Sequence, residues 1–267
     1  MRDAPPLRPR LRPPRRNRAR ARSGGRCRRR AADPLAGPGI DAIVTLGLGA
    51  KLQPAYDGAN RYVASPWPIV GLKFLRSPFT GQETSDTGFG FRPTFRFLDE
   101  RKGTGDLAGL NRVKSAYEVG AQIDYTDTYW RAYVEFRQGF GGHTGQLYDV
   151  GAEGIFRPAP AWRIALGPKL SFASSEYMRT YFGVTGAESV ASGGKFAAYN
   201  PSGGIRAAGV TAQATYAFDK NWLVRADAGY ERLVGDATSS PIVKRAGDVN
   251  QFTVGLGVAY RFGIGWH

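Results

Sequence analysis

From Phe252 to Trp266 every second residue is apolar, and the residues between them are small or polar. Successive side chains of a β-strand point to opposite faces, so this segment has one apolar face and one small or polar face. The length of the segment, and the aromatic residues near its end, favour an apolar face that meets lipid. If other segments repeat the pattern, it predicts an outer-membrane β-barrel.

The alternation recurs along the chain, and several apolar stripes begin or end in Trp, Tyr or Phe, as an aromatic girdle requires. No stretch approaches the roughly 20 consecutive apolar residues of a spanning helix, and the mean hydropathy of −0.35 suits a barrel whose inner face is polar. We therefore predict an all-β protein, a single antiparallel transmembrane barrel of about ten strands over residues 41–267. Its strands are expected near 44–52, 70–74, 89–97, 117–125, 130–136, 148–156, 162–172, 210–218, 222–231 and 252–266.

Charged residues of both signs occupy the faces opposite the apolar stripes. In lipid they would be costly, whereas a polar lumen accommodates them. The predicted lumen-facing charges are Arg92, Arg96, Glu118, Arg131, Glu135, Arg137, Asp149, Glu153, Arg163, Lys169, Arg225, Asp227 and Glu231.

The connecting segments support this strand count. Short links at 126–128, 157–161 and 219–221 are typical of periplasmic turns, and longer links at 53–61, 99–113, 139–145, 175–202 and 236–248 are expected to face outward. The link at 76–86 is long for a periplasmic turn. One alternative stays open: pairing of 177–184 with 196–199 would give twelve strands.

The first 38 residues have a different composition from the rest. They hold 13 Arg and two acidic residues, a net charge of +11, whereas the other 229 residues carry only +4 of the total of +15. Such a segment has almost nothing to bury and is expected to be disordered. It lacks the apolar region of a secretory signal, and we interpret it as a mis-framed or mis-started signal peptide. A genuine disordered tail and a nucleic-acid arm are the alternatives, but no nucleic-acid module adjoins it.

No motif for catalysis, a cofactor or a metal is apparent. Cys27 is the sole cysteine, which leaves no intrachain disulfide. His143, in a glycine-rich link, could belong to a lipid-hydrolase site on the barrel rim, but we expect a solvated loop histidine. The glycine-rich segments at 192–194 and 202–204 lack the strand–loop–helix context of a phosphate-binding loop.

Four groups of residues resemble motifs of the MltA-interacting protein/OmpV family of Gram-negative outer-membrane proteins. They are LGLGA at 46–50 with PAYDG at 54–58 and PWP at 66–68; YFGV at 181–184 with Ser189 and SGG at 192–194; Tyr230 and Leu233 with GDA at 235–237 and SPIV at 240–243; and GLGVAYRF at 255–262. The resemblance covers about residues 43–262. The family begins with a cleavable signal, of which residues 1–38 show no recognisable form, and tends to end at the aromatic residue matching Phe262.

The resemblance implies an outer-membrane barrel that is a scaffold for a murein lytic transglycosylase and a penicillin-binding protein. It marks Tyr260 and Phe262 as the strand end that the barrel-assembly machinery reads. The loop residues of the family motifs either serve ordinary barrel architecture or bind a partner: Tyr56, Gly58, Tyr181, Phe182, Gly183, Gly235, Asp236, Ser240 and Pro241.

We predict a structural or binding protein, not an enzyme, embedded in outer-membrane lipid. A scaffold for peptidoglycan-remodelling enzymes is the leading hypothesis. A porin-like channel or an adhesin is the main alternative, and a barrel lipid hydrolase comes last. The sequence leaves the partner, the oligomeric state and the openness of the lumen undetermined.

Overall fold

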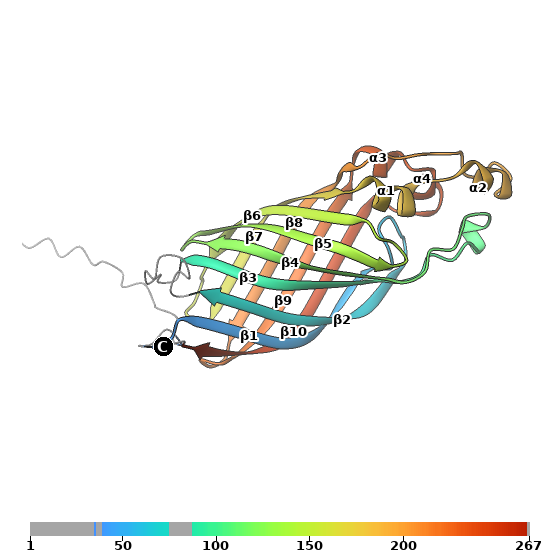
Figure 1. Cartoon of the computed structure of the whole chain (residues 1–267). Helices are drawn as coiled ribbons and strands as arrows, with labels where there is room; N and C mark the ends of the chain where they lie inside the picture. Colours follow the sequence, from blue (N-terminus) through green and yellow to red (C-terminus); the bar gives the residue numbers. More distant parts are fainter. Residues whose placement is uncertain (1–34, 36–38, 75–86, 266–267) are drawn as a thin grey trace, which may run out of the picture. The chain divides into compact units, whose positions relative to one another are not determined.

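Ten antiparallel strands close into one barrel in the computed structural model, which describes Leu35 and residues 39–74 and 87–265 (Figure 1). Each strand pairs with its neighbours in sequence, and the last pairs with the first, from Ala42 opposite Ile264 to Leu52 opposite Val254. The predicted ten-stranded barrel is confirmed. The strands are β1 (Ala42–Pro54), β2 (Tyr62–Phe74), β3 (Gly88–Leu98), β4 (Ala116–Thr126), β5 (Trp130–Gly141), β6 (Gln146–Phe156), β7 (Trp162–Ala173), β8 (Gly204–Ala217), β9 (Trp222–Leu233) and β10 (Asn250–Ile264).

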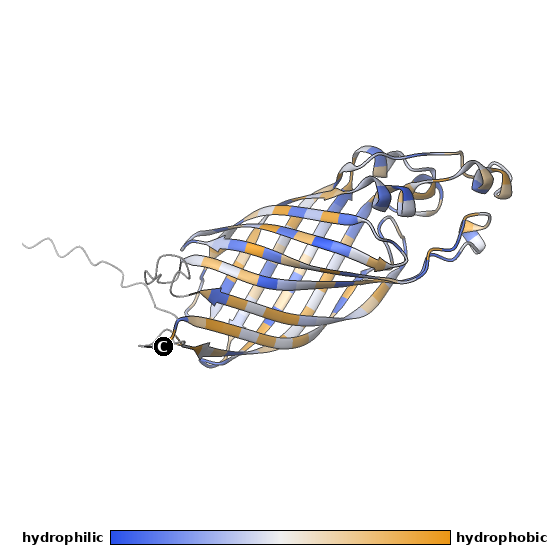
Figure 2. Cartoon of the chain, viewed as in Figure 1, coloured by the Kyte–Doolittle hydropathy of each residue, from blue (hydrophilic) through white to orange (hydrophobic). Residues whose placement is uncertain are grey.

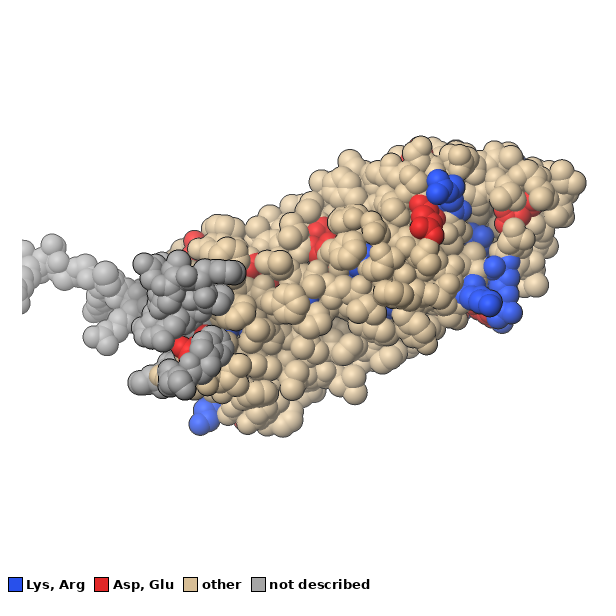
Figure 3. All heavy atoms as spheres, in the orientation of Figure 1, with Lys and Arg blue, Asp and Glu red and all other residues tan. Residues whose placement is uncertain are grey.

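The apolar stripes cover the outer wall of the barrel. In β10 the side chain of Leu256 is 61% exposed, while Gly255 and Gly257 are buried. Figure 2 shows the alternation along the strands, and in Figure 3 the visible wall is largely uncharged while charged side chains gather at the helical end. Such a surface is stable only in contact with lipid or another apolar phase.

Aromatic pairs mark the edge of this wall at the end with the short turns. Trp222 packs against Tyr260 with ring centroids 5.0 Å apart, and Trp162 packs against Tyr216 at the same distance. Asp219 tightens the turn before β9, because its Oδ1 accepts hydrogen bonds from the amides of Asn221 and Trp222 at 2.7 Å each. We call this end of the barrel the turn end.

The helical segments all lie in the longer connections at the opposite end, the loop end (Figure 1). No helix in the described part of the chain is long and apolar enough to cross a membrane. The helices are η1 (Gly105–Leu107), α1 (Ser175–Phe182), α2 (Gly186–Ala191), α3 (Gly235–Ser239) and α4 (Pro241–Ala246).

The connection 175–202 is helical, so the twelve-strand alternative is wrong. Its local sequence starts two helices: Ser174 caps α1 with its side chain, and Thr185 forms a capping box with Glu188 at the start of α2. Of the alternative pairing, the structure contains one isolated antiparallel bridge, between Val184 and Tyr199.

The Arg-rich segment 1–38, apart from Leu35, and the link 76–86 lie outside the described residues, as does Trp266. The predictions made for them stay predictions. Ile264 still belongs to β10, so the apolar stripe continues beyond Phe262 by one outward position.

Candidate functional site

The interior of the barrel holds a cavity of about 250 Å³ that is lined by side chains from most of the strands. Of the charged residues predicted to face the lumen, eleven line this cavity. The other two are Glu118, whose side chain is fully buried against Arg96 and Arg137, and Arg163, whose Nη1 lies 3.5 Å from Oε1 of Gln213. Among the predicted charges, the barrel thus brings together residues that are up to 139 positions apart, from Arg92 to Glu231.

Eight of the charged side chains form a closed circuit across the lumen, which we call the charge belt: Asp57, Arg96, Glu118, Arg137, Asp149, Lys169, Glu231 and Arg206. Each member pairs with the next and the last pairs with the first, so acids and bases alternate. Glu118 Oε2 lies 3.1 Å from Arg137 Nε, and Arg137 Nη2 lies 3.0 Å from Asp149 Oδ2. The circuit closes because Asp57 pairs with both Arg206 and Arg96. The belt ties seven strands to the β1–β2 loop.

Asp57 is the point at which the belt meets the loops. Its carboxylate accepts hydrogen bonds from Arg96, from Arg206, and from the Tyr177 hydroxyl at 2.6 Å. Burial by itself raises the pKa of this carboxyl. Arg206 and Arg96, followed by the hydrogen bond from Tyr177, outweigh that effect and hold the pKa of Asp57 well below its ordinary value. Asp57 is therefore ionised at neutral pH.

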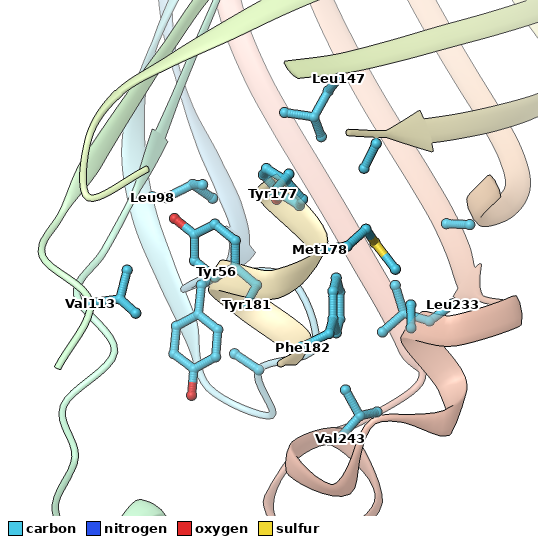
Figure 4. Packing of buried hydrophobic residues seen from close by; sticks show 14 of the residues in the cluster. Tyr56, Leu98, Val113, Leu147, Tyr177, Met178, Tyr181, Phe182, Leu233 and Val243 are labelled. Carbon is cyan, nitrogen blue, oxygen red and sulfur yellow. The ribbon is translucent and has the colours of Figure 1, made fainter. Parts of the chain in front are cut away.

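A hydrophobic cluster adjoins the belt at the loop end, and we call it the loop plug (Figure 4). Helix α1 contributes the central side chains, with Tyr177, Tyr181 and Phe182 each at most 1% exposed. Burial raises the pKa of Tyr177 well above its ordinary value, so its hydroxyl remains a donor to Asp57. The other members of the plug are Ala55, Tyr56, Ala59, Leu98, Val113, Ala116, Leu147, Ala173, Met178, Ala207, Leu233, Ala237 and Val243.

The family-motif loop residues meet in and around this plug, although they come from three connections. Tyr56 stacks on Tyr181 with ring centroids 6.3 Å apart, and Ser240 donates a 2.7 Å hydrogen bond from its hydroxyl to the carbonyl of Phe182. Gly58 has a φ of +84°, and a Cβ there would lie 2.8 Å from Cγ2 of Val243. These contacts fit the architectural interpretation of the motif residues, and a direct partner-binding role stays untested.

The remaining motif residues shape the same loops. Gly183 ends α1, Pro241 occupies the first turn of α4, and Gly235 has a φ of +56° at the start of α3. The carboxylate of Asp236 accepts a 2.8 Å hydrogen bond from the amide of Ser202. Tyr260 and Phe262 lie elsewhere, on β10 toward the turn end, where Tyr260 packs against Trp222.

His143 is not a solvated loop histidine, and that prediction is wrong. Its imidazole is buried, and Nε2 lies 3.5 Å from Oε1 of Glu118. The ring also packs edge-on against Tyr177 and Tyr181, with ring centroids 4.9 and 5.3 Å apart. Neither ring nitrogen has a hydrogen-bond partner. The glycine-rich link permits this burial, because a Cβ at Gly139 would collide with the imidazole. Without Cβ at that position, the loop folds back into the plug.

Toward the turn end the lumen holds separate ion pairs. Arg131 Nη2 lies 2.6 Å from Glu153, and Arg92 Nη2 lies 3.1 Å from Asp124. Trp67, on β2, has the ammonium of Lys51 4.7 Å from its ring centroid and the guanidinium of Arg225 at 5.1 Å. Both cations therefore lie within cation–π range of one indole. Among the described residues, no grouping of His, Cys, Asp and Glu could hold a metal ion.

Sequence reasoning missed Arg206, which is 2% exposed and belongs to the belt. Counting by twos from Val210, an outward residue of β8, places Arg206 on the lipid face. The register between β7 and β8 shifts between Ser171 and Phe172, so that Ser171 opposes Ala207 while Phe172 opposes Ile205. The extra residue is Arg206, and this β-bulge turns its side chain inward. The one sequence signal for its inward position is that the alternation would place an arginine on the lipid-facing side, where a charge is costly.

Comparison with known proteins shows what the chain is similar to. The model of the family described as MltA-interacting protein MipA matches residues 46–262. Outer membrane protein Omp26La of Vibrio anguillarum is 31% identical over 169 residues, and outer membrane protein OmpV of Vibrio cholerae serotype O1 is 30% identical over 169 residues. Each match covers 62% of this chain and 57% of the relative, so the chain spans little more than half the length of these relatives. The N-terminal β-barrel domain of Pseudomonas aeruginosa OprF is similar with a TM-score of 0.31 and 12% identity, over 84% of this chain and 99% of that domain.

Proposed function

Because the chain belongs to the MltA-interacting protein (MipA) family of outer-membrane β-barrel proteins, we propose that it is a scaffold that holds a murein lytic transglycosylase at the outer membrane. A penicillin-binding protein is the proposed second partner. The family name supports the first partner. The geometric support is the charge belt with the loop plug above it, which fills the loop end of the barrel with tightly paired side chains. A filled, cross-braced barrel is a rigid support for a docked protein.

We place the docking surface at the turn end, which the predicted topology directs to the periplasm. Tyr129, in the turn between β4 and β5, is 74% exposed. Arg157, in the neighbouring turn, donates a hydrogen bond to the carbonyl of Thr128 and so braces the turn that carries Tyr129. Tyrosine and arginine are the residue types enriched at the centres of protein interfaces. Tyr129 is the proposed anchor of the partner.

Co-purification after crosslinking tests the scaffold. The barrel is expected to retain the lytic transglycosylase, and Tyr129→Ala is expected to weaken that retention. Val190→Ala is the matched control, because Val190 is 81% exposed on α2 at the loop end. If the crosslinked wild-type barrel captures no transglycosylase, the scaffold proposal is wrong. If the control variant and not Tyr129→Ala loses the partner, the docking surface is at the loop end instead.

A porin-like channel is the second candidate, and the polar cavity of about 250 Å³ favours it. Conductance across planar bilayers distinguishes the two functions, because a scaffold with a closed plug carries no current. A steady current through the wild-type barrel would favour the channel. An adhesin would use the loop end, and no contact of a described residue favours a lipid hydrolase built on His143.

A further inference from the structure

One junction of the barrel wall is far less complete than the others. Among the described residues, β2 and β3 are in register at two positions, where Leu72 opposes Phe91 and Lys73 opposes Gly90. Every other pair of neighbouring strands is in register over at least eight positions. We call the stretch of β2 and β3 on the loop side of the Leu72–Phe91 pair the seam.

Prolines account for the seam. Continued from Leu72 and Phe91, the register would oppose Val70 to Pro93, Pro68 to Phe95 and Pro66 to Phe97. Proline has no amide hydrogen, so each of these three pairs would lack one of its two hydrogen bonds. The ladder of β2 with β1 is continuous through Pro66 and Pro68, so the missing donors are those that would face β3. Three successive pairs at this junction would therefore each lack one hydrogen bond.

The seam is bounded at both ends. On the turn side the pair of Leu72 and Phe91 closes it. On the loop side β3 is tied to the start of the β1–β2 loop and not to β2, since the Asp99 amide donates a 2.7 Å hydrogen bond to the Ala55 carbonyl. Between these points the carbonyl of Phe97 accepts a 2.6 Å hydrogen bond from Nε2 of Gln53, a side chain of β1. The opening is thus a window in the wall rather than a split barrel.

The lumen cavity reaches this window. Its lining includes inward residues next to the seam, such as Trp67 and Thr94, and also Pro68, Pro93 and Phe95. These last three are exposed on the outer wall. Residues of the lipid-facing surface thus line the internal cavity on both strands of the incompletely paired junction. The hydroxyl of Thr94 is buried and has no hydrogen-bond partner.

The lumen side of the window is basic and the outer side is apolar. Eight of the residues that line the cavity are Lys or Arg and six are Asp or Glu. Two of the basic residues lie at the window: Lys51 lies over Trp67, and the side chain of Arg92 approaches Gly71 of β2. None of the ion pairs described above includes Lys51. A molecule that fits both sides has one apolar chain and an anionic head.

We propose that the seam is a lateral portal by which a single-chain amphiphile with an anionic head passes between the outer membrane and the lumen. The chain lies between β2 and β3, against the prolines and Phe95. The head lies in the cavity near Lys51 and Arg92. This portal is independent of the scaffold function, because it uses the side of the barrel and not its turn end.

Closing the seam tests the portal. In a Cys27→Ser background, Pro68→Cys with Phe95→Cys is bridged by a short reducible bis-methanethiosulfonate linker, and Val134→Cys with Val150→Cys on the fully paired β5–β6 junction is the control. The probe is a fatty acid with a photoreactive diazirine close to its carboxylate, in phosphatidylcholine vesicles. Adducts are expected in the peptides that hold Trp67 and Thr94. Linking the seam is expected to reduce them about tenfold, reduction to restore them, and the control linker to have no effect.

The contrary results are equally definite. Labelling of these peptides that is unchanged by the linker, or adducts spread evenly over the outward stripes, overturns the portal, since either result means ordinary contact with lipid. The matching fatty alcohol carries the same chain without charge and is expected to label the outer wall alone. If Lys51→Gln does not weaken saturable labelling by the acid, the proposed headgroup site is wrong.

Hydrogen exchange of the wild-type protein tests the seam without any substitution. The amides of Val70 and Phe95 face the seam and are expected to exchange at least about tenfold faster than those of Val119 and Val134, which lie in complete ladders. Equal protection at both places would show that the seam is closed, and the portal proposal would be abandoned.

Discussion

Arg206 donates a hydrogen bond to Oδ2 of Asp57, although 149 positions of sequence separate them. Arg206 reaches the lumen through a β-bulge in β8, and Asp57 reaches it from the β1–β2 loop. Their contact closes the charge belt and also joins it to the loop plug, because the Tyr177 hydroxyl donates to the same carboxylate oxygen. The loops at this end are therefore part of the barrel's interior rather than a cover over it.

Asp57→Asn is expected to destabilise the barrel strongly. Removing one partner of a buried charge pair leaves the other uncompensated, which costs about 3–5 kcal/mol. Here the buried Arg206 and the 17% exposed Arg96 each lose one carboxylate partner and keep another, Glu231 and Glu118 respectively, so a loss toward the lower end of that range is expected. Urea unfolding in detergent micelles measures the loss. Asp99→Asn is the control, since Asp99 pairs with an exposed Arg61, and such pairs contribute at most about 1 kcal/mol. Equal losses in the two variants would show that the belt is not stabilising.

Protonation of the Asp57 carboxylate is expected to lower the stability of the barrel at acid pH. Because the folded-state pKa of Asp57 is lowered, its contribution is fully present above the unfolded pKa of about 3.9. It is lost progressively as the pH falls below that value and toward the folded-state pKa. Unfolding free energy measured between neutral pH and pH 2 is expected to fall more steeply in the wild type than in Asp57→Asn. Parallel curves would contradict the assignment.

Gly58→Ala is expected to disturb the plug. The residue has a φ of +84°, and the added Cβ would lie 2.8 Å from Val243, so the variant carries both backbone strain of about 1–2 kcal/mol and crowding of about 1–3 kcal/mol. Gly194→Ala separates these effects, because Gly194 has a φ of +77° and nothing within 4 Å of the added atom. Thermal unfolding of the two variants is the measurement. A loss at Gly194 as large as that at Gly58 would mean that crowding against Val243 has no effect.

Tyr177→Ala is expected to open the loop end. The variant removes a ring from the centre of the plug and the hydroxyl that anchors it to Asp57. Current through planar bilayers is expected to be absent or rare for the wild type and to rise in this variant. Tyr177→Phe keeps the ring and loses one hydrogen bond, so it is expected to stay closed while losing about 1–3 kcal/mol of stability. A wild type that conducts as well as Tyr177→Ala would show that the plug does not close the lumen.

The alternation of apolar with small or polar residues was sufficient to predict most of the barrel wall. It located all ten strands and the apolar stripes, because lipid selects one face of every strand and the alternation is local. The same count assigned thirteen charges to the inner face. In the structure eleven of them line the cavity, Glu118 is buried beside it, and Arg163 lies next to Gln213. The predicted roles of the family-motif residues in binding partners, and of Phe262 in assembly, stay predictions.

Other features were beyond a local pattern. His143 was expected in solvent because its neighbours are glycines, yet those glycines make the space in which its imidazole is buried. The sequence left open whether 175–202 is a long link or holds two further strands. In the structure it is a link that contains helices, which the side-chain caps at Ser174 and Thr185 start. The seam was also hidden, since three prolines weaken a wall only when they fall on the two strands that face each other.

The sequence by itself determined that this chain is an outer-membrane barrel of about ten strands, because strand periodicity and transfer of side chains to lipid are properties of single segments. The tertiary structure alone decided which of the inward charges meet and how the loops join them. Arg206 faces inward because of a register shift between β7 and β8. Asp57 contacts it from the β1–β2 loop, 149 positions away in the sequence. Such pairings arise only after the barrel closes, because closure brings distant residues to opposite sides of one lumen, and no local pattern encodes which of them meet.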